Sequence, residues 1–396
     1  MRKLVLAALL VYASNSFAYT LESFCDEVYK HDLFVVDIEG EKLAVKYDKE
    51  AAMAFEPLSL EFGNRRITTD ESKKEQESSA MLGFSTKMPW LRASEKKIYL
   101  SKEKGLLISE QLQKTILKSE VKRLYISLLL FDELENIYSQ KKNIAEASYK
   151  AAKKKFESGR ISNMELARFD AELSQSEIDF SSASAQKEEL HHALSHMVLS
   201  HDEIVITDLG FVFYKNLEEK LGGFAKESLQ LKELEAKKQE LEAEIGTYKY
   251  ALVDKVEFGI GYTKEAAQRS VDFRASFPLN ITGKNENMKA SARAKLFAIT
   301  KKQKIIQDTL TMMAKAETQR LRELEKKISV STQSERLYKS VFDMTAKGYE
   351  NGVVSVFEYL NAKNGYFDAL AKTITYKKEY VEEIAKLEKV FTGVIK

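Results

Sequence analysis

The residue cluster most able to do chemistry is a group of histidines near the middle of the chain. Four of the five histidines, His191, His192, His196 and His201, fall within eleven residues. His192 and His196 are four apart, so on a helix they share a face, a spacing that can hold a metal ion. No cysteine accompanies them, and a solvated helix end explains the cluster equally well. His192 and His196 are therefore weak candidates, and no metal is expected.

No other group of residues has the spacing of a catalytic site. The sequence has no glycine-rich phosphate loop and no nucleophile elbow, and Cys25 is its only cysteine. We therefore expect a protein that is not an enzyme and needs no cofactor. Free cysteine behaves as a small apolar residue, so Cys25 is expected in a helix, half buried, with lipidation as the alternative.

Two glutamates occupy equivalent places in a motif that occurs twice, at residues 156–166 and 349–359, an offset of 193 residues. In each copy a glycine supplies the positive φ that ends a long helix. A serine three residues later caps the returning helix, and a glutamate follows in its first turn. These residues are Gly159, Ser162 and Glu165 in the first copy and Gly352, Ser355 and Glu358 in the second.

Long helical segments flank both motifs. Residues 284–347 contain neither glycine nor proline, and residues 90–158 contain only Gly105. Apolar residues recur at steps of four and three, which is coiled-coil spacing. Returning helices are expected at 162–200 and 353–391, and further helices at 20–56, with a possible break at Gly40, and at 217–250. The apolar positions are Leu117, Val121, Leu124, Leu128 and Phe131, then Ile306, Leu310, Met313, Leu321, Leu324 and Ile328.

Two β-hairpins, at 58–89 and 254–279, precede the long helices. Their strands alternate apolar residues with small or polar ones, and the first hairpin is expected to have a polar loop at 69–78. Such strands suit a membrane barrel, with one face toward lipid and the other toward water. Four strands are too few, because the smallest barrels of this kind have about eight and open edges are not tolerated in lipid. If the strands span a membrane, several chains must therefore contribute to one barrel.

The N-terminal targeting signal and the net charge of the chain agree with an exported protein. A basic start, an apolar run and Ser16-Phe17-Ala18 predict a signal peptide at 1–18. The first structural repeat then spans 19–216 and the second 217–396. Without Arg2 and Lys3, 60 basic residues face 60 acidic ones, which argues against nucleic-acid binding. Trp90, directly after Pro89, suits either an aromatic belt at the membrane rim or a bundle core.

This order of helix, hairpin, long helix, glycine turn and returning helix, present twice after a signal peptide, resembles the TolC-type outer-membrane efflux proteins. The second hairpin and the alanine-rich helix start at 290–294 are similar to the CzcC-like metal-efflux branch. The resemblance implies a mainly α fold with a transmembrane hairpin pair, a homotrimer with a twelve-stranded barrel in outer-membrane lipid, and a helical tunnel across the periplasm.

The resemblance also implies roles for the repeated motifs. Gly159, Gly352, Ser162 and Ser355 would lie at the periplasmic tip, where an adaptor docks and connects to an inner-membrane RND or ABC transporter. Tyr349 matches the family's gating tyrosine. Glu165 and Glu358 match constriction positions and would form a carboxylate ring that selects cations. Val354 and Asn361 replace two charged gate residues of the family.

Three functions remain open at this point. The first is a passive exit duct of a tripartite efflux system for small molecules or metal ions. The second is the outer-membrane component of type I protein secretion. The third is a periplasmic coiled-coil scaffold whose hairpins serve as adhesive modules.

Overall fold

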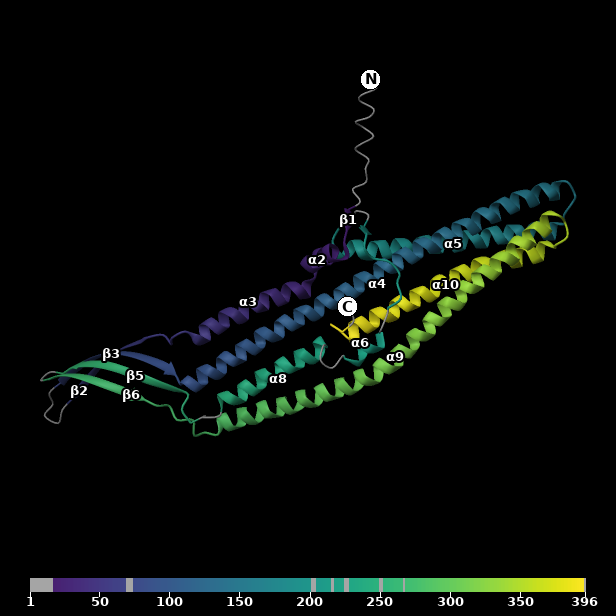
Figure 1. The fold of residues 1–396 in the computed structure, drawn as a ribbon. Coiled ribbons are helices and arrows are strands. Elements are labelled where there is room, and N and C mark those ends of the chain that lie inside the picture. The colour runs from purple at the N-terminus through teal and green to yellow at the C-terminus, as the bar shows by residue number, and fades with distance from the viewer. Residues whose placement is uncertain are drawn as a thin grey trace, which may run out of the picture. The chain divides into compact units, whose positions relative to one another are not determined.

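The computed structural model describes residues 17–68, 74–200, 204–214, 217–223, 228–248, 252–265 and 268–394 (Figure 1). Most of the predicted signal peptide lies outside these residues. The chain forms two compact units, and each contains parts of both sequence repeats. The first unit comprises Met1–Val36, Leu112–Ser228 and Thr309–Lys396, and the second comprises Asp37–Gln111 and Leu229–Asp308.

The first unit is a helical bundle with a small parallel strand pair. The strand pair joins β1 (Phe17–Tyr19) to β4 (Ile204–Ile206). Two long helices, α4 (Pro89–Glu157) and α9 (Lys284–Glu350), run through both units and end in the first. The other helices described in this unit are α2 (Leu21–His31), α5 (Asn163–Met197), α6 (Leu217–Gly222) and α10 (Val356–Val390).

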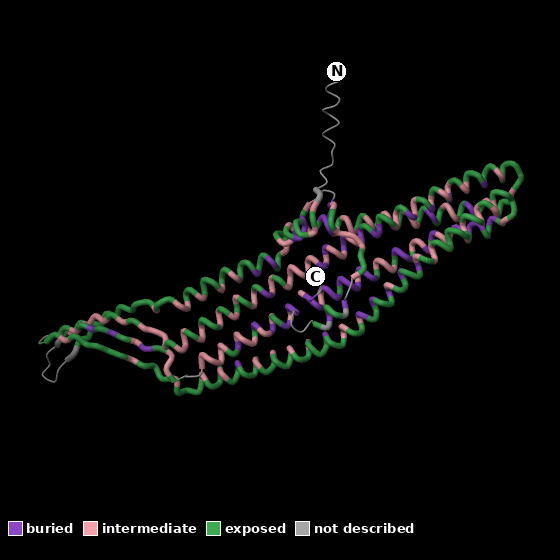
Figure 2. Tube along the Cα trace, viewed as in Figure 1, coloured by how far each residue is buried: buried purple, intermediate pink, exposed green. Residues whose placement is uncertain are grey.

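The predicted 3–4 spacing is confirmed as the core of this bundle. Val121 is fully buried, and Leu124, Leu128 and Phe131 on the same side of α4 are also buried. On α9, four of the six predicted positions are buried, namely Leu310, Leu321, Leu324 and Ile328. Figure 2 shows buried residues recurring along these helices. Burial of one apolar stripe, rather than helix propensity alone, therefore stabilises helices of this length.

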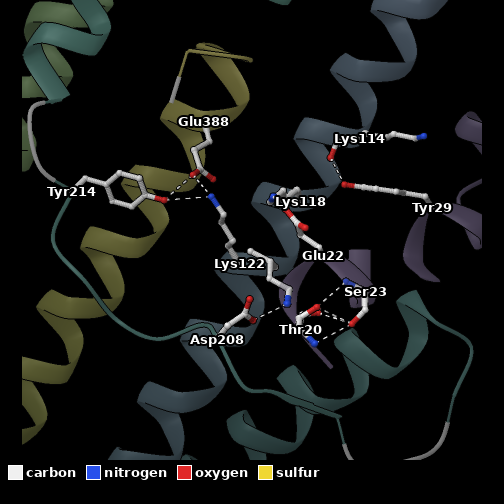
Figure 3. Close-up of polar contacts among 11 residues, drawn as sticks. Thr20, Glu22, Ser23, Tyr29, Lys114, Lys118, Lys122, Asp208, Tyr214 and Glu388 are labelled. Atoms are coloured by element: carbon white, nitrogen blue, oxygen red, sulfur yellow. Dashed lines mark hydrogen bonds and ion pairs between the residues drawn. The ribbon is translucent and has the colours of Figure 1, made fainter. Parts of the chain in front are cut away.

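Residues 204–214, which lead into the second sequence repeat, form polar contacts with other parts of the first unit (Figure 3). Asp208 accepts a hydrogen bond of 2.7 Å from the backbone N–H of Leu21, and Tyr214 donates one of 2.8 Å to Glu388. Lys122 of α4 pairs with the same carboxylate at 2.8 Å. Burial beside Glu388 raises the pKa of Tyr214, so its hydroxyl stays protonated.

The second unit contains a four-stranded antiparallel sheet and parts of four helices. Its own helices are α3 (Leu33–Met53), which begins in the first unit, and α8 (Leu229–Thr247). The strands are β2 (Ser59–Thr68), β3 (Lys74–Lys87), β5 (Lys255–Lys264) and β6 (Arg269–Ser276), in the order β2-β3-β5-β6. The expected fold, mainly helical with two hairpins, is confirmed. Across the described residues, no helix combines the length and apolar character needed to cross a membrane.

Two helix predictions are wrong. The break expected at Gly40 lies at Asp32, whose side-chain oxygen accepts a hydrogen bond of 3.0 Å from the N–H of Val35 and so caps α3. A glycine inside a helix only lowers its stability, whereas a capping side chain starts a new one. The helix expected at 217–250 is not continuous: in the described residues α6 ends at Gly222, and α8 begins only at Leu229.

The polar loop expected at 69–78 is also wrong in its second half. Strand β3 begins at Lys74, and its residues Lys74–Ser78 pair with Asn64–Thr68 of β2. Both partners in this stretch are mostly polar, so the alternation that identifies a strand in sequence is absent there. The paired backbone alone extends the hairpin beyond its apolar part.

Candidate channel sheet and helical tips

The four-stranded sheet of the second unit has one apolar face, and that face is exposed. The strand register places large apolar residues opposite one another, with Phe84 opposite Phe258 and Ile260 opposite Phe273. The rings of Phe84 and Phe258 stack at 5.2 Å. Phe62 is 78% exposed and Phe273 80% exposed, so neither meets a core. The other large apolar residues of this face are Leu60, Leu82, Tyr262 and Val271.

The opposite face of the sheet carries small and charged residues. Gly83 lies opposite Gly259, Gly261 opposite Asp272, and Gly259 opposite Arg274. A sheet that buries its apolar face in a protein core would show the reverse exposure. This amphipathic surface therefore suits an apolar medium on one side and water on the other.

Both edges of the sheet are open within one chain. Among the residues that the structure describes, β2 pairs only with β3, and β6 pairs only with β5. Each edge thus presents backbone N–H and C=O groups that a further strand can bind. Because every neighbouring pair is antiparallel, β2 and β6 run in opposite directions.

In the first unit, the turn between α4 and α5 ends its helix with a Schellman motif. Gly159 has φ +71°, which confirms the predicted left-handed position. Its N–H donates to the carbonyl of Phe156 at 2.8 Å, and the N–H of Arg160 donates to the carbonyl of Lys155 at 2.8 Å. Nothing lies within 4 Å of a Cβ built at Gly159, so φ and not space requires the glycine.

The turn between α9 and α10 repeats this geometry. Gly352 has φ +74° and donates to the carbonyl of Tyr349 at 3.1 Å. The N–H of Val353 donates to the carbonyl of Gly348 at 2.9 Å. A Cβ built at Gly352 likewise meets nothing within 4 Å. Both turns are exposed (Figure 2).

Capping boxes begin both returning helices. Ser162 caps α5 and Ser355 caps α10, as predicted. Glu165 accepts a hydrogen bond of 2.8 Å from the N–H of Ser162, and Glu358 accepts one of 3.0 Å from the N–H of Ser355. These bonds to the capping serines lower the pKa of both carboxyls. Each glutamate therefore has a capping role within its own helix, and the constriction role stays a prediction.

Tyr349 belongs to an aromatic cluster that joins the two helical hairpins. Its ring stacks on Tyr359 at 5.0 Å and lies 6.2 Å from the ring of Phe169 on α5. Lys155 Nζ lies 4.7 Å from the centre of the Tyr349 ring. A second cation–π contact places the guanidinium of Arg168 5.6 Å from Phe357. Within one chain, then, Tyr349 contacts both hairpins, and its gating role stays a prediction.

Lys363 is a buried charge that sequence reasoning missed. Its side chain is fully buried on α10, and its Nζ lies 2.7 Å from Oε1 of Glu172 on α5. The two atoms form an ion pair by distance but are not aligned as a hydrogen bond. Burial lowers the pKa of Lys363, against the effect of Glu172. The signal was present: Lys363 continues the apolar stripe that includes Leu360 and Phe367, where a lysine requires a partner.

The remaining candidates show no site. The ring centres of His191 and His192 lie 6.2 Å apart on α5. Among the residues that the structure describes, no three His, Cys, Asp or Glu residues are placed to hold a metal ion. Cys25 is 2% exposed in the core around Val121 and Leu194, more buried than expected. Burial raises the pKa of its thiol to about 11.

Comparison with known proteins links the second half of the chain to one family. Residues 225–393 match the family model described as "Outer membrane efflux protein". No curated protein sequence matches the chain. The expectation that the chain is not an enzyme agrees with a family of efflux proteins.

Solved structures match nearly the whole chain. Crystal structures of CusC share 14% identity and a TM-score of 0.75, covering 95% of this chain and 93% of the other. The structure of VceC from Vibrio cholerae shares 12% identity and a TM-score of 0.76, covering 94% of this chain and 96% of VceC. The CmeC outer membrane channel of Campylobacter jejuni shares 16% identity and a TM-score of 0.70, covering 95% of this chain and 86% of CmeC. Residues 225–393 thus match the outer membrane efflux protein family, and the chain as a whole shares the fold of these outer membrane channels.

Proposed function

We propose that this protein is the outer-membrane exit duct of a tripartite efflux assembly and works as a homotrimer. Three copies of the four-stranded sheet would form a barrel of twelve strands. The long helices would line the path for cargo. The chain supplies no energy of its own, so a periplasmic adaptor and an inner-membrane RND-type pump would drive transport of small molecules or metal ions.

The open amphipathic sheet is the observation that carries this proposal. An apolar face in lipid requires every backbone group at the edges to be paired. Copies inserted the same way up can pair β6 of one with β2 of the next, because the two edges run in opposite directions. This pairing is antiparallel and head to tail, so it closes only as a ring.

The helices and their turns support the second part of the proposal. Helix α4 has 69 residues, which gives about 100 Å of contour. This length suits a periplasmic tunnel better than a compact globule. The exposed turns at Gly159 and Gly352 would then be the surface that an adaptor meets. Contacts such as Lys155 with Tyr349 would change when the tip opens.

Cross-linking between the two sheet edges tests the proposal. A variant with Phe62→Cys on β2 and Phe273→Cys on β6, in a Cys25→Ser background, should form disulfides between copies. Neighbouring cysteine positions on β2 should be scanned, because the register between copies is set only in the assembly. The expected product in outer-membrane fractions is a covalent trimer that resists heating without reductant.

A matched variant controls for random collision. Phe62→Cys with Ile260→Cys places the second cysteine on β5, an interior strand of the sheet. It should give no covalent trimer. A chain that extracts without detergent as a folded monomer, or that cross-links equally in both variants, would contradict the proposed ring.

A further inference from the structure

The two tips of the first unit differ sharply in charge. Residues 150–160 of the first tip contain five cations and one carboxylate. The equivalent residues 343–353 of the second tip contain one cation and two carboxylates. Since both turns have the same backbone hydrogen bonds, this difference is not required by the fold.

Three of the positively charged side chains at the first tip are exposed and make no polar contact with another described residue. Lys150 pairs with Glu146, and Lys155 lies over the Tyr349 ring. The side chains of Lys153, Lys154 and Arg160 are exposed and make no ion pair or hydrogen bond with any other residue that the structure describes. We call these three residues the basic patch.

The fold holds the basic patch together. Lys153 and Lys154 lie in the last turns of α4. The N–H of Arg160 is bonded to the carbonyl of Lys155, so Arg160 stays against the end of the same helix. At the second tip the equivalent residues are Ala346, Lys347 and Val353, and Val353 is 83% exposed.

From this asymmetry we infer that the first tip binds an acidic segment of the periplasmic partner protein, while the second tip makes apolar contacts with it. The inference rests on the proposed function and adds the partner's chemistry. Unpaired cations at close spacing attract carboxylates and raise the rate of encounter. Val353 and Phe357, both exposed, offer the second tip an apolar contact instead.

A protein fits this surface better than an anionic membrane does. The second tip carries exposed Asp343, Glu350 and Glu358, and cation–π contacts between the hairpins hold it beside the first. A sheet of anionic headgroups across both tips would be repelled by these carboxylates. A folded partner can place its own carboxylates against the basic patch alone.

Binding of paired synthetic probes tests the inference. The probes are two helical hairpins on one neutral scaffold, with either Glu or Gln beside the turn. The full chain, held in amphipol as the assembled protein, should bind the Glu hairpin about tenfold more tightly than the Gln hairpin at low salt. This preference should disappear at high salt and in the triple variant Lys153→Gln, Lys154→Gln, Arg160→Gln.

A control variant removes the same number of positive charges from a surface away from the basic patch. Lys301, Lys302 and Lys304 on α9 are also exposed and make no ion pair in the described chain. Their triple Gln variant should keep the wild-type preference. Equal binding of both hairpins, or equal loss in both triple variants, overturns the inference.

Two further measurements separate the alternatives. Vesicles of phosphatidylglycerol should not bind through the basic patch; patch-dependent flotation without any hairpin preference would assign the patch to a membrane and overturn the inference. Trimer content and planar-bilayer conductance are measured on the same preparation. A conducting trimer that ignores the acidic hairpin overturns this inference alone, whereas absence of a trimer contradicts the proposed function.

Discussion

The first and second tips show how one backbone can present two surfaces. At an offset of 193 residues they share a left-handed glycine, the same Schellman hydrogen bonds and a serine–glutamate capping box. They differ in the residues around that frame. Lys155 of the first tip corresponds to Gly348 of the second, where a built Cβ would lie 2.5 Å from Val354.

This difference separates structural residues from those available for binding. Val354 can pack closely on α9 because Gly348 has no side chain there. Lys155 instead reaches across to the ring of Tyr349. Thus the first tip offers charge, the second offers a close-packed apolar turn, and neither change disturbs the hydrogen bonds that form the turn.

A bulky side chain at the second tip should have the largest effect. Gly352→Trp should reduce efflux to the level of cells lacking the protein, because it would obstruct the proposed adaptor docking and because a non-glycine residue at φ +74° costs about 1–2 kcal/mol. Accumulation of a fluorescent efflux substrate measures the loss, with Gly159→Trp as the comparison. Trimers should persist in the outer membrane, since the Cβ position is open. Loss of the trimer would assign the glycine to folding and not to docking.

Breaking the buried pair between the hairpins should come next. Lys363→Met removes the ion-pair partner of Glu172, which then keeps only the hydrogen bond from Asn364, and should cost about 3–5 kcal/mol. Faster hydrogen exchange of α10 amides would report the loss. The double variant Lys363→Met, Glu172→Leu should recover most of the protection. If the single variant exchanges like the wild type, the pair does not hold the second hairpin to the first.

Neutralising the two capping glutamates should change ion selectivity and little else. Glu165→Gln with Glu358→Gln keeps both capping boxes, because Gln can accept the same hydrogen bonds. Single-channel recordings should show a lower cation preference, of about a fewfold, if the carboxylates form a ring. Unchanged selectivity would leave both residues with a capping role alone.

Removing each capping serine should have a smaller and equal effect on the two tips. Ser162→Ala and Ser355→Ala each remove a helix cap and should cost about 1 kcal/mol of local stability. Exchange of the first-turn amides of α5 and α10 measures this cost. A clear difference between the two variants would show that the tips are not equivalent in backbone stability.

Acid should destabilise both tips in the same way, and this should be the smallest of the expected effects. The folded-state pKa of Glu165 and Glu358 is lowered, so their contribution to stability is present above the ordinary value of 4.5. It is lost as pH falls through the folded-state pKa. The protection factors of amides at the two turns, measured against the unstructured exchange rate at each pH, should therefore be unchanged near neutral pH and should fall only below about pH 4.5. The double Gln variant should not show this decrease.

The sequence predicted those features that depend on local patterns. Gly159, Gly352 and their capping serines follow from single-residue preferences, and the long helices follow from apolar spacing without prolines. The start of β3 at Lys74 was missed because its residues and their partners on β2 are mostly polar. The break at Asp32 was missed because its capping bond competes with an otherwise continuous helical pattern.

Contacts between distant segments were beyond sequence reasoning. The Lys363–Glu172 pair joins residues 191 positions apart, and only the packed bundle brings them together. Tyr349 likewise contacts Lys155 on α4 and Phe169 on α5, both far away in sequence, whereas its third partner, Tyr359, lies just across the turn on α10. The short strand β1 forms only because β4 lies beside it. No periodicity in the sequence predicts these contacts.

The residue directly after each glycine, Arg160 or Val353, contributes only its backbone N–H to the turn. Evolution can therefore exchange that side chain freely without cost to the architecture. Arg160 and Val353 give the two tips different surface chemistry on the same hydrogen-bonded turn. The residues that form each turn are in this way separate from the residues that define its surface.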